Sequence, residues 1–131
     1  MIDEAIEKVR IFQKKAGQPT ESFPKKMPLD RVISRAKWIK DEIEEFEEAE
    51  TIYEQADALI DITYYLLGTF VECGLKADEL FNIVHEANMK KLSTGEVIKE
   101  NDLRVCKPKD WNHPSEEIKK VIDRLNEEKT N

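Results

Sequence analysis

The sequence predicts an all-α fold, a helical bundle with a central antiparallel pair of helices and a small β-hairpin near the C-terminus. The first observation is that apolar residues in 31–49 recur at alternating intervals of four and three, as on one face of an amphipathic helix: Val32, Ala36, Ile39, Ile43 and Phe46. The second is the segment 56–71, which is apolar or aromatic at most positions and therefore predicts a buried helix. A chain of 131 residues is long enough for a core of its own, so we expect a single domain over 1–131.

The N-terminal helices have recognisable ends. The first helix is expected from Ile2 to Lys15, and it stops before Gly17. An ordered loop over 18–29, which contains three prolines, connects it to the helix over 31–49. Asp30 is the expected N-cap of that second helix, because an aspartate side chain can accept a hydrogen bond from a free backbone N–H of the first turn.

The next helix is expected over 53–73, and only a short connection near Thr51 separates it from the helix over 31–49. Two helices joined so closely must pack antiparallel. Because 53–73 is apolar around most of its circumference, we expect it to be the central and most buried helix. Three elements complete the prediction: a helix over 77–92, the hairpin over 96–107 and a last helix from about Pro114 to Glu127.

The composition argues against several classes of function. The formal net charge is −7 and no basic patch dominates, so the chain is not expected to bind a nucleic-acid polymer. No apolar run reaches the roughly 18 residues of a membrane span, and the acidic N-terminus does not have the pattern of a signal peptide. Cys73 and Cys106 lack metal-ligand spacing, and we therefore expect a cytoplasmic protein in a reducing compartment.

Two pairs of carboxylates form the most informative pattern in the chain. Glu42 and Glu45 are three residues apart and Asp57 and Asp61 are four apart, so each pair lies on one face of its helix. The two aspartates are the only charges in 56–71, where an unpaired carboxylate costs several kcal/mol of desolvation. Four carboxylates on two antiparallel helices make an oxygen-rich site of the kind that Mg²⁺ prefers, with Mn²⁺ as a substitute.

Two other interpretations of these acids stay open. The aspartates can form a buried salt bridge, for example to Arg35, which lies on the same side of its helix as Glu42. The glutamates belong to an acidic run over 41–50, which taken alone is typical of a solvated helix face. Asp41 lies on the far side of the helix from the apolar stripe, so it is less well aimed at the aspartates.

Candidate substrate contacts lie in three places. Asn88 and Lys91 share a helix face and offer an amide and a cation for phosphate or sugar, although a polar helix end has the same pattern. Lys107 and Lys109 belong to a rigid basic and aromatic stretch that either closes over a nucleotide or packs on the bundle. Trp38 falls between Glu42 and Glu45 around the circumference of its helix. It offers a surface for stacking on a base, but a partly buried tryptophan needs no ligand to explain it.

These motifs together resemble the MazG-like all-α nucleoside triphosphate pyrophosphohydrolases, and within them the phosphoribosyl-ATP pyrophosphohydrolase-like branch. The resemblance rests on three patterns: Asp41-Glu42-x-x-Glu45, Asp57-x-x-x-Asp61 and His85-x-x-Asn88-x-x-Lys91. It covers nearly the whole chain. One departure is in the second acid pair, where many relatives have Glu-x-x-Asp and this chain has Ala58 at the position three before Asp61.

The resemblance implies a helical bundle that assembles as a homodimer or a dimer of dimers. It implies Mg²⁺-dependent cleavage of a nucleoside triphosphate between the α- and β-phosphates, to a monophosphate and pyrophosphate. The implied metal ligands are Glu42, Glu45, Asp57 and Asp61, with Asp41 as an accessory acid and Asn88 and Lys91 on phosphate or sugar. We expect a house-cleaning reaction on surplus or non-canonical triphosphates. The alternatives are phosphoribosyl-ATP hydrolysis in histidine synthesis and a catalytically silent helical interaction protein.

Overall fold

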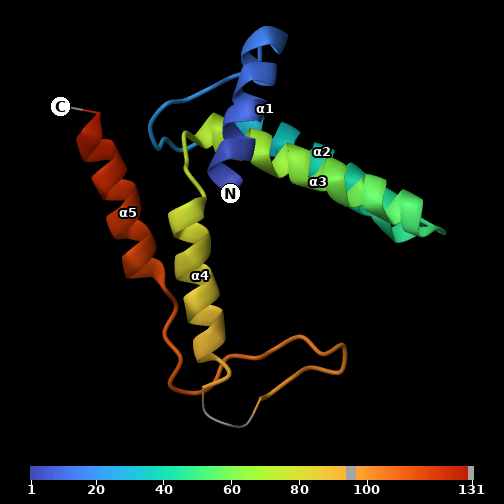
Figure 1. Cartoon of the computed structure of the whole chain (residues 1–131), viewed down its shortest axis with the longest axis vertical. Helices are drawn as coiled ribbons and strands as arrows, with labels where there is room; N and C mark the ends of the chain where they lie inside the picture. Colours follow the sequence, from blue (N-terminus) through green and yellow to red (C-terminus); the bar gives the residue numbers. More distant parts are fainter. Residues whose placement is uncertain (94–96, 130–131) are drawn as a thin grey trace. The chain divides into compact units, whose positions relative to one another are not determined.

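A computed structural model describes residues 1–93 and 97–129, and these contain five α-helices and no β-strand. The helices are α1 (Ile2–Ala16), α2 (Leu29–Glu48), α3 (Ile52–Cys73), α4 (Asp78–Lys90) and α5 (Ser115–Glu128), and Figure 1 shows each of them. The chain divides into two compact units, Met1–Lys76 with α1 to α3 and Ala77–Asn131 with α4 and α5. The prediction of an all-α fold is confirmed.

In the first unit, α2 and α3 lie side by side, and α1 crosses them near the C-terminal end of α3 (Figure 1). The core of this unit is small. It combines apolar and polar buried residues: Ile6, Val9 and Gln13 of α1, Arg35 of α2, and Ala58, Gly68, Val71 and Glu72 of α3. Backbone hydrogen bonds from Glu21 to Val71 (3.0 Å) and from Lys25 to Cys73 (2.9 Å) hold the loop after α1 against the end of α3.

The ends of the paired helices follow from a few local signals. Thr51 caps α3, since its hydroxyl oxygen accepts the backbone N–H of Glu54 at 3.1 Å. Gly74 ends α3 in the left-handed conformation, with φ 65°, and a Cβ at this position would lie 2.1 Å from the carbonyl oxygen of Phe23. Only glycine therefore lets the α1–α2 loop approach the end of α3 so closely.

The prediction that Asp30 caps α2 is wrong. The helix begins at Leu29, and the extended Pro28 before it supplies the carbonyl oxygen that accepts the N–H groups of Arg31 and Val32, both at 3.1 Å. Asp30 lies inside the first turn, where a negative charge still favours the positive end of the helix dipole.

The burial of α3 also differs from the expectation. Only four of its 22 residues are buried, and several large apolar side chains are exposed, among them Leu59 (49%) and Ile60 (66%). The reason is geometric: within this unit α3 is covered by α2 on one side and by α1 near one end, so the opposite face of an all-round apolar helix keeps no neighbour.

In the second unit, α4 packs against α5. A β-hairpin was predicted over 96–107. Residue 96 lies outside the described residues, and over 97–107 the prediction is wrong. One isolated antiparallel bridge pairs Lys99 with Val105. The turn between them holds Leu103 at φ 73°, a left-handed conformation that is unfavourable for leucine, and pairing does not extend into strands.

No single helix of the described chain is long and apolar enough to cross a membrane, although α3 and α4 taken together pass the same test by length and composition alone.

Candidate functional site

Three carboxylates converge on the α2–α3 pair. Glu42 and Glu45 come from neighbouring turns of α2, and Asp61 faces them from α3; one oxygen of each lies within 4.8 Å of the others. We call these three residues the carboxylate cluster. The i, i+3 spacing places both glutamates on one face of α2, and the antiparallel packing brings the middle of α3 to the same level. Three oxygen ligands at such distances are suited to a hard divalent cation.

One atom of this cluster lacks a partner. Among the described side chains, Glu42 Oε2 is buried and makes no hydrogen bond. Burial, a hydrogen bond with Glu45 and the charges of Glu45, Asp61 and Asp57 raise the pKa of Glu42. Burial also raises the pKa of Asp61, together with the charges of Asp57 and Glu45. Carboxylates that repel one another and leave a buried oxygen unsatisfied are stabilised by a bound cation, so these residues fit a metal ion.

The other two acids lie at the margin of the cluster. Asp57 is exposed and outside the group of three, although it is near enough for its charge to act on Glu42 and Asp61. Asp41 is exposed and pairs with Lys37 at 3.1 Å, one turn earlier on α2. Asp41 lies outside the cluster although Glu42 is the next residue, because successive residues of a helix point about 100° apart around its axis.

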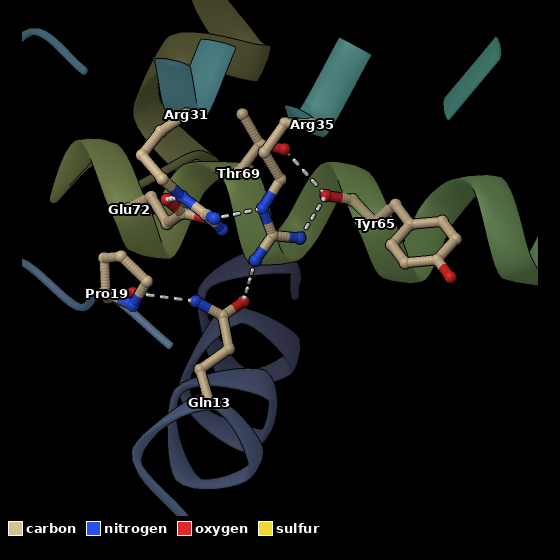
Figure 2. A network of polar contacts seen from close by, with 7 residues as sticks. All are labelled: Gln13, Pro19, Arg31, Arg35, Tyr65, Thr69 and Glu72. Carbon is tan, nitrogen blue, oxygen red and sulfur yellow. Dashed lines mark hydrogen bonds and ion pairs between the residues drawn. The ribbon is translucent and has the colours of Figure 1, made fainter. Parts of the chain in front are cut away.

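One interpretation of the sequence paired Arg35 with the aspartates, but in the structure Arg35 binds Glu72 instead. It belongs to a second polar group, which we call the arginine cluster and which consists of Gln13, Arg31, Arg35 and Glu72 (Figure 2). Arg31 binds both carboxylate oxygens of Glu72 at 2.9 Å, and Arg35 Nε donates to the same carboxylate. Burial alone would raise the pKa of Glu72, but its hydrogen bonds with the two arginines outweigh burial and lower the pKa.

Sequence reasoning missed the arginine cluster. Its signal was present: Arg31 and Arg35 share a face of α2, and Glu72 follows the apolar run of α3 as a lone charge. The fourth member, Gln13, could be recognised only from the packing of α1 in the structure. Gln13 Oε1 accepts Arg35 Nη2 at 3.0 Å, and Gln13 Nε2 donates to the carbonyl oxygen of Pro19 at 3.0 Å (Figure 2).

Trp38 lies between the two clusters. The guanidinium carbons of Arg31 and Arg35 lie over its ring, 5.4 and 4.9 Å from the centroid, and the ring of Tyr65 packs against it at 5.7 Å. Trp38 precedes Glu42 by one helical turn and is half-buried. Its ring is thus held by three neighbours within the first unit and keeps part of its surface open.

The remaining predicted substrate contacts belong to the second unit. Asn88 and Lys109 are exposed. Lys91 and Lys107 place their ammonium groups over the ring of Trp111, 4.8 and 5.5 Å from its centroid. Trp111 Nε1 donates to the carbonyl oxygen of Ala87 at 2.7 Å, which anchors the segment after residue 107 on α4. This contact matches the interpretation in which the basic stretch packs on a helix.

The fold and the carboxylate cluster together define an all-helical protein with a site suited to a divalent cation between two paired helices. The family model for phosphoribosyl-ATP pyrophosphohydrolase matches residues 8–88, which is more than half of the chain, and the protein belongs to this family. The suspected family is thereby confirmed. A search of curated proteins found no match. Family membership supports a general pyrophosphohydrolase activity on nucleotides.

Proposed function

We propose that this protein is a Mg²⁺-dependent nucleoside triphosphate pyrophosphohydrolase that cleaves a (d)NTP to its monophosphate and pyrophosphate. The observation that carries the proposal is the carboxylate cluster, in which Oε2 of Glu42 is buried and has no hydrogen-bond partner among the described residues. Membership of a pyrophosphohydrolase family and the formal net charge of −7 support a small polyphosphate substrate held through a cation.

Each group of residues has a defined task in this proposal. Glu42, Glu45 and Asp61 would hold the ion, with Asp57 adding charge at its edge. Bound Mg²⁺ would neutralise phosphate oxygens and polarise the attacking water. The reaction consumes one water and releases a proton, and the carboxylates supply positioning and charge rather than a nucleophile. Asp41, already paired with Lys37, would act from outside the cluster.

The candidate contacts to phosphate and sugar are residues of the second unit. Asn88 and Lys91 would bind phosphate or sugar, and Lys107 and Lys109 would add positive charge. The described part of this unit also has an open cavity of about 680 Å³, with Lys90, Lys109 and Trp111 among its lining residues. These assignments follow the family resemblance and the residue chemistry.

We also propose that the protein is a homodimer, or a dimer of dimers, built on the exposed face of α3. Large apolar residues on this face recur every seven positions, as in helices that pack along their length: Ile52, Leu59 and Leu66, with Tyr53 and Ile60 beside them. Tyr53 is 83% exposed and Ile60 66% exposed in the single chain. A second copy would bury this face and turn one helix pair into a four-helix bundle.

A second candidate substrate is phosphoribosyl-ATP, and the description of the matching family favours it. A panel of canonical and modified nucleoside triphosphates together with phosphoribosyl-ATP, incubated with Mg²⁺, separates the two. We expect pyrophosphate and a monophosphate from several triphosphates. Turnover restricted to phosphoribosyl-ATP would assign the protein to histidine synthesis. Release of orthophosphate would rule out α–β cleavage, and no turnover at all would favour an interaction protein.

A further inference from the structure

Within the arginine cluster, positive charges outnumber negative ones. Two guanidinium groups bind one carboxylate, and the fourth member, Gln13, is neutral; the charge of Asp30 also acts on Arg31, more weakly than Glu72 does. Arg35 and Glu72 are each only 3% exposed. Such a buried group is weak evidence for stability, because well-packed apolar residues of similar volume often stabilise a fold equally well. Its surplus charge points instead to a task at its edge.

That edge is the indole of Trp38. Arg31 and Arg35 bind the same carboxylate, so their guanidinium groups approach the Trp38 ring together and occupy one side of it. A cation over an aromatic face attracts it electrostatically, and partial burial strengthens the attraction. The two arginines therefore restrict the orientation of this ring.

Arg35 also contacts α3, the partner of its own helix α2. Arg35 Nη1 donates to the carbonyl oxygen of Tyr65 at 3.5 Å (Figure 2). The Tyr65 ring also lies against the Trp38 ring, with the centroids 5.7 Å apart. Trp38 is one turn from Glu42 on α2, and Tyr65 is one turn from Asp61 on α3. Arg35 thus contacts one aromatic residue on each helix, Trp38 on α2 and Tyr65 on α3, and each is one turn from a residue of the carboxylate cluster.

We infer that Arg35, held by Glu72 and Gln13, is a positioning residue that fixes the Trp38 indole as a stacking surface for the base of the nucleotide. The inference rests on the proposed function. Arg31 backs the same side of the ring, so the base would meet the indole surface that the guanidinium groups leave open. The arginine cluster would then act on recognition of the base and not on the phosphates or the metal ion.

The test combines spectroscopy with binding and kinetics. Replacing Trp111 with phenylalanine leaves Trp38 as the only tryptophan, whose emission then reports its surroundings. Kinetics are measured with Trp111 in place. For Arg35→Lys and Arg31→Gln we expect red-shifted Trp38 emission, greater quenching by acrylamide and a KM for nucleoside triphosphates raised about tenfold. The kcat should change less than about threefold, a split typical of lost uniform binding.

Inorganic tripolyphosphate, which has no base, provides the matched ligand. Its inhibition constant and the Mg²⁺ dependence should be the same in both variants as in the wild type. Arg10→Gln is the matched control variant. Arg10 lies in the same unit and donates to the carbonyl oxygen of Glu21 at 2.7 Å, whereas the guanidinium groups described over the Trp38 ring are those of Arg31 and Arg35. It should leave Trp38 emission and KM unchanged.

Three results would overturn the inference: unchanged Trp38 emission in a folded variant, an unchanged KM, or a parallel rise of KM and of the tripolyphosphate inhibition constant. If Arg35→Lys fails to fold, Arg31→Gln decides, because the side chain of Arg31 is 24% exposed and its loss leaves the contact between Arg35 and Glu72. If the wild type released no pyrophosphate, the proposed function would fail, and emission with nucleotide binding would still decide whether Arg35 orients Trp38 for a base.

Discussion

Gly68→Ala tests the packing that joins the arginine cluster to α3. A Cβ at position 68 would lie 2.4 Å from Gln13 Oε1 and 2.5 Å from Arg35 Nη1. Both atoms belong to buried side chains that are already hydrogen-bonded, so neither can withdraw without breaking a contact. The added methyl group therefore has to displace the bond between Gln13 and Arg35.

The magnitude follows from three contributions. Replacing glycine with alanine inside a helix stabilises it by about 1 kcal/mol. Losing a buried hydrogen bond to a charged group costs about 1.5–3 kcal/mol, and overpacking costs about 1–3 kcal/mol more. The net expectation is a loss of about 1.5–5 kcal/mol in the free energy of unfolding. Urea unfolding followed by circular dichroism measures this loss.

A double-mutant cycle provides the control. In Gln13→Ala one of the two side chains that meet the new methyl group is gone and its bond to Arg35 is already lost, so adding Gly68→Ala should cost less there than in the wild type. If Gly68→Ala instead stabilises the wild type by about 1 kcal/mol, as helix propensity alone predicts, the close approach of α1 and α3 at this point is refuted.

Four further predictions address the site and the assembly. Glu42→Gln should lower kcat at least about a hundredfold with helical content unchanged, while Asp41→Asn, at the exposed neighbour, should lower it less than about threefold; equal losses would show that Asp41 belongs to the site. In metal-free protein, the raised pKa values of Glu42 and Asp61 mean that the folded state keeps protons that the unfolded chain releases, so the free energy of unfolding should fall as pH rises from the ordinary carboxyl range through these raised values. Saturating Mg²⁺ or Glu42→Gln should weaken this dependence, and unfolding curves across pH with and without chelator decide it. Ile60→Lys should convert the proposed homodimer to monomer in light scattering, whereas an exposed change on the polar side, Glu44→Lys, should leave the mass unchanged; a wild-type monomer at micromolar concentration contradicts the assembly. Lys91→Ala should raise KM or lower kcat for triphosphates, with Lys120→Ala, at an exposed lysine of α5, as the control; identical kinetics of both variants would remove Lys91 from the substrate site.

The sequence alone determined the helices and the family. Apolar spacing of three and four residues is a local property, and so is a glycine such as Gly17 after the end of a helix, which explains why the predicted bounds agree with the structure to within two residues. The same spacing selected Glu42 and Glu45 as residues of one face. The order of the acid motifs and the Asn88 segment indicated the family that the match over 8–88 confirms.

The hairpin was beyond the reach of local pattern. Short β-prone runs on either side of a polar turn predicted strands over 96–107. The turn places Leu103 in a left-handed conformation. In the part of the chain that the structure describes, no third strand joins the two short runs, and they gain too little to extend a single bridge.

Only the tertiary structure decided which acids meet and which charges pair. Helical periodicity gives the face on which a side chain lies, but the distance across two helices depends on their rotation and relative shift along the axis. That arrangement brings Asp61 to Glu42, leaves Asp57 at the edge and sends Arg35 to Glu72. It also decided that an apolar helix such as α3 keeps one face exposed, because burial depends on what packs beside a residue as well as on its own chemistry.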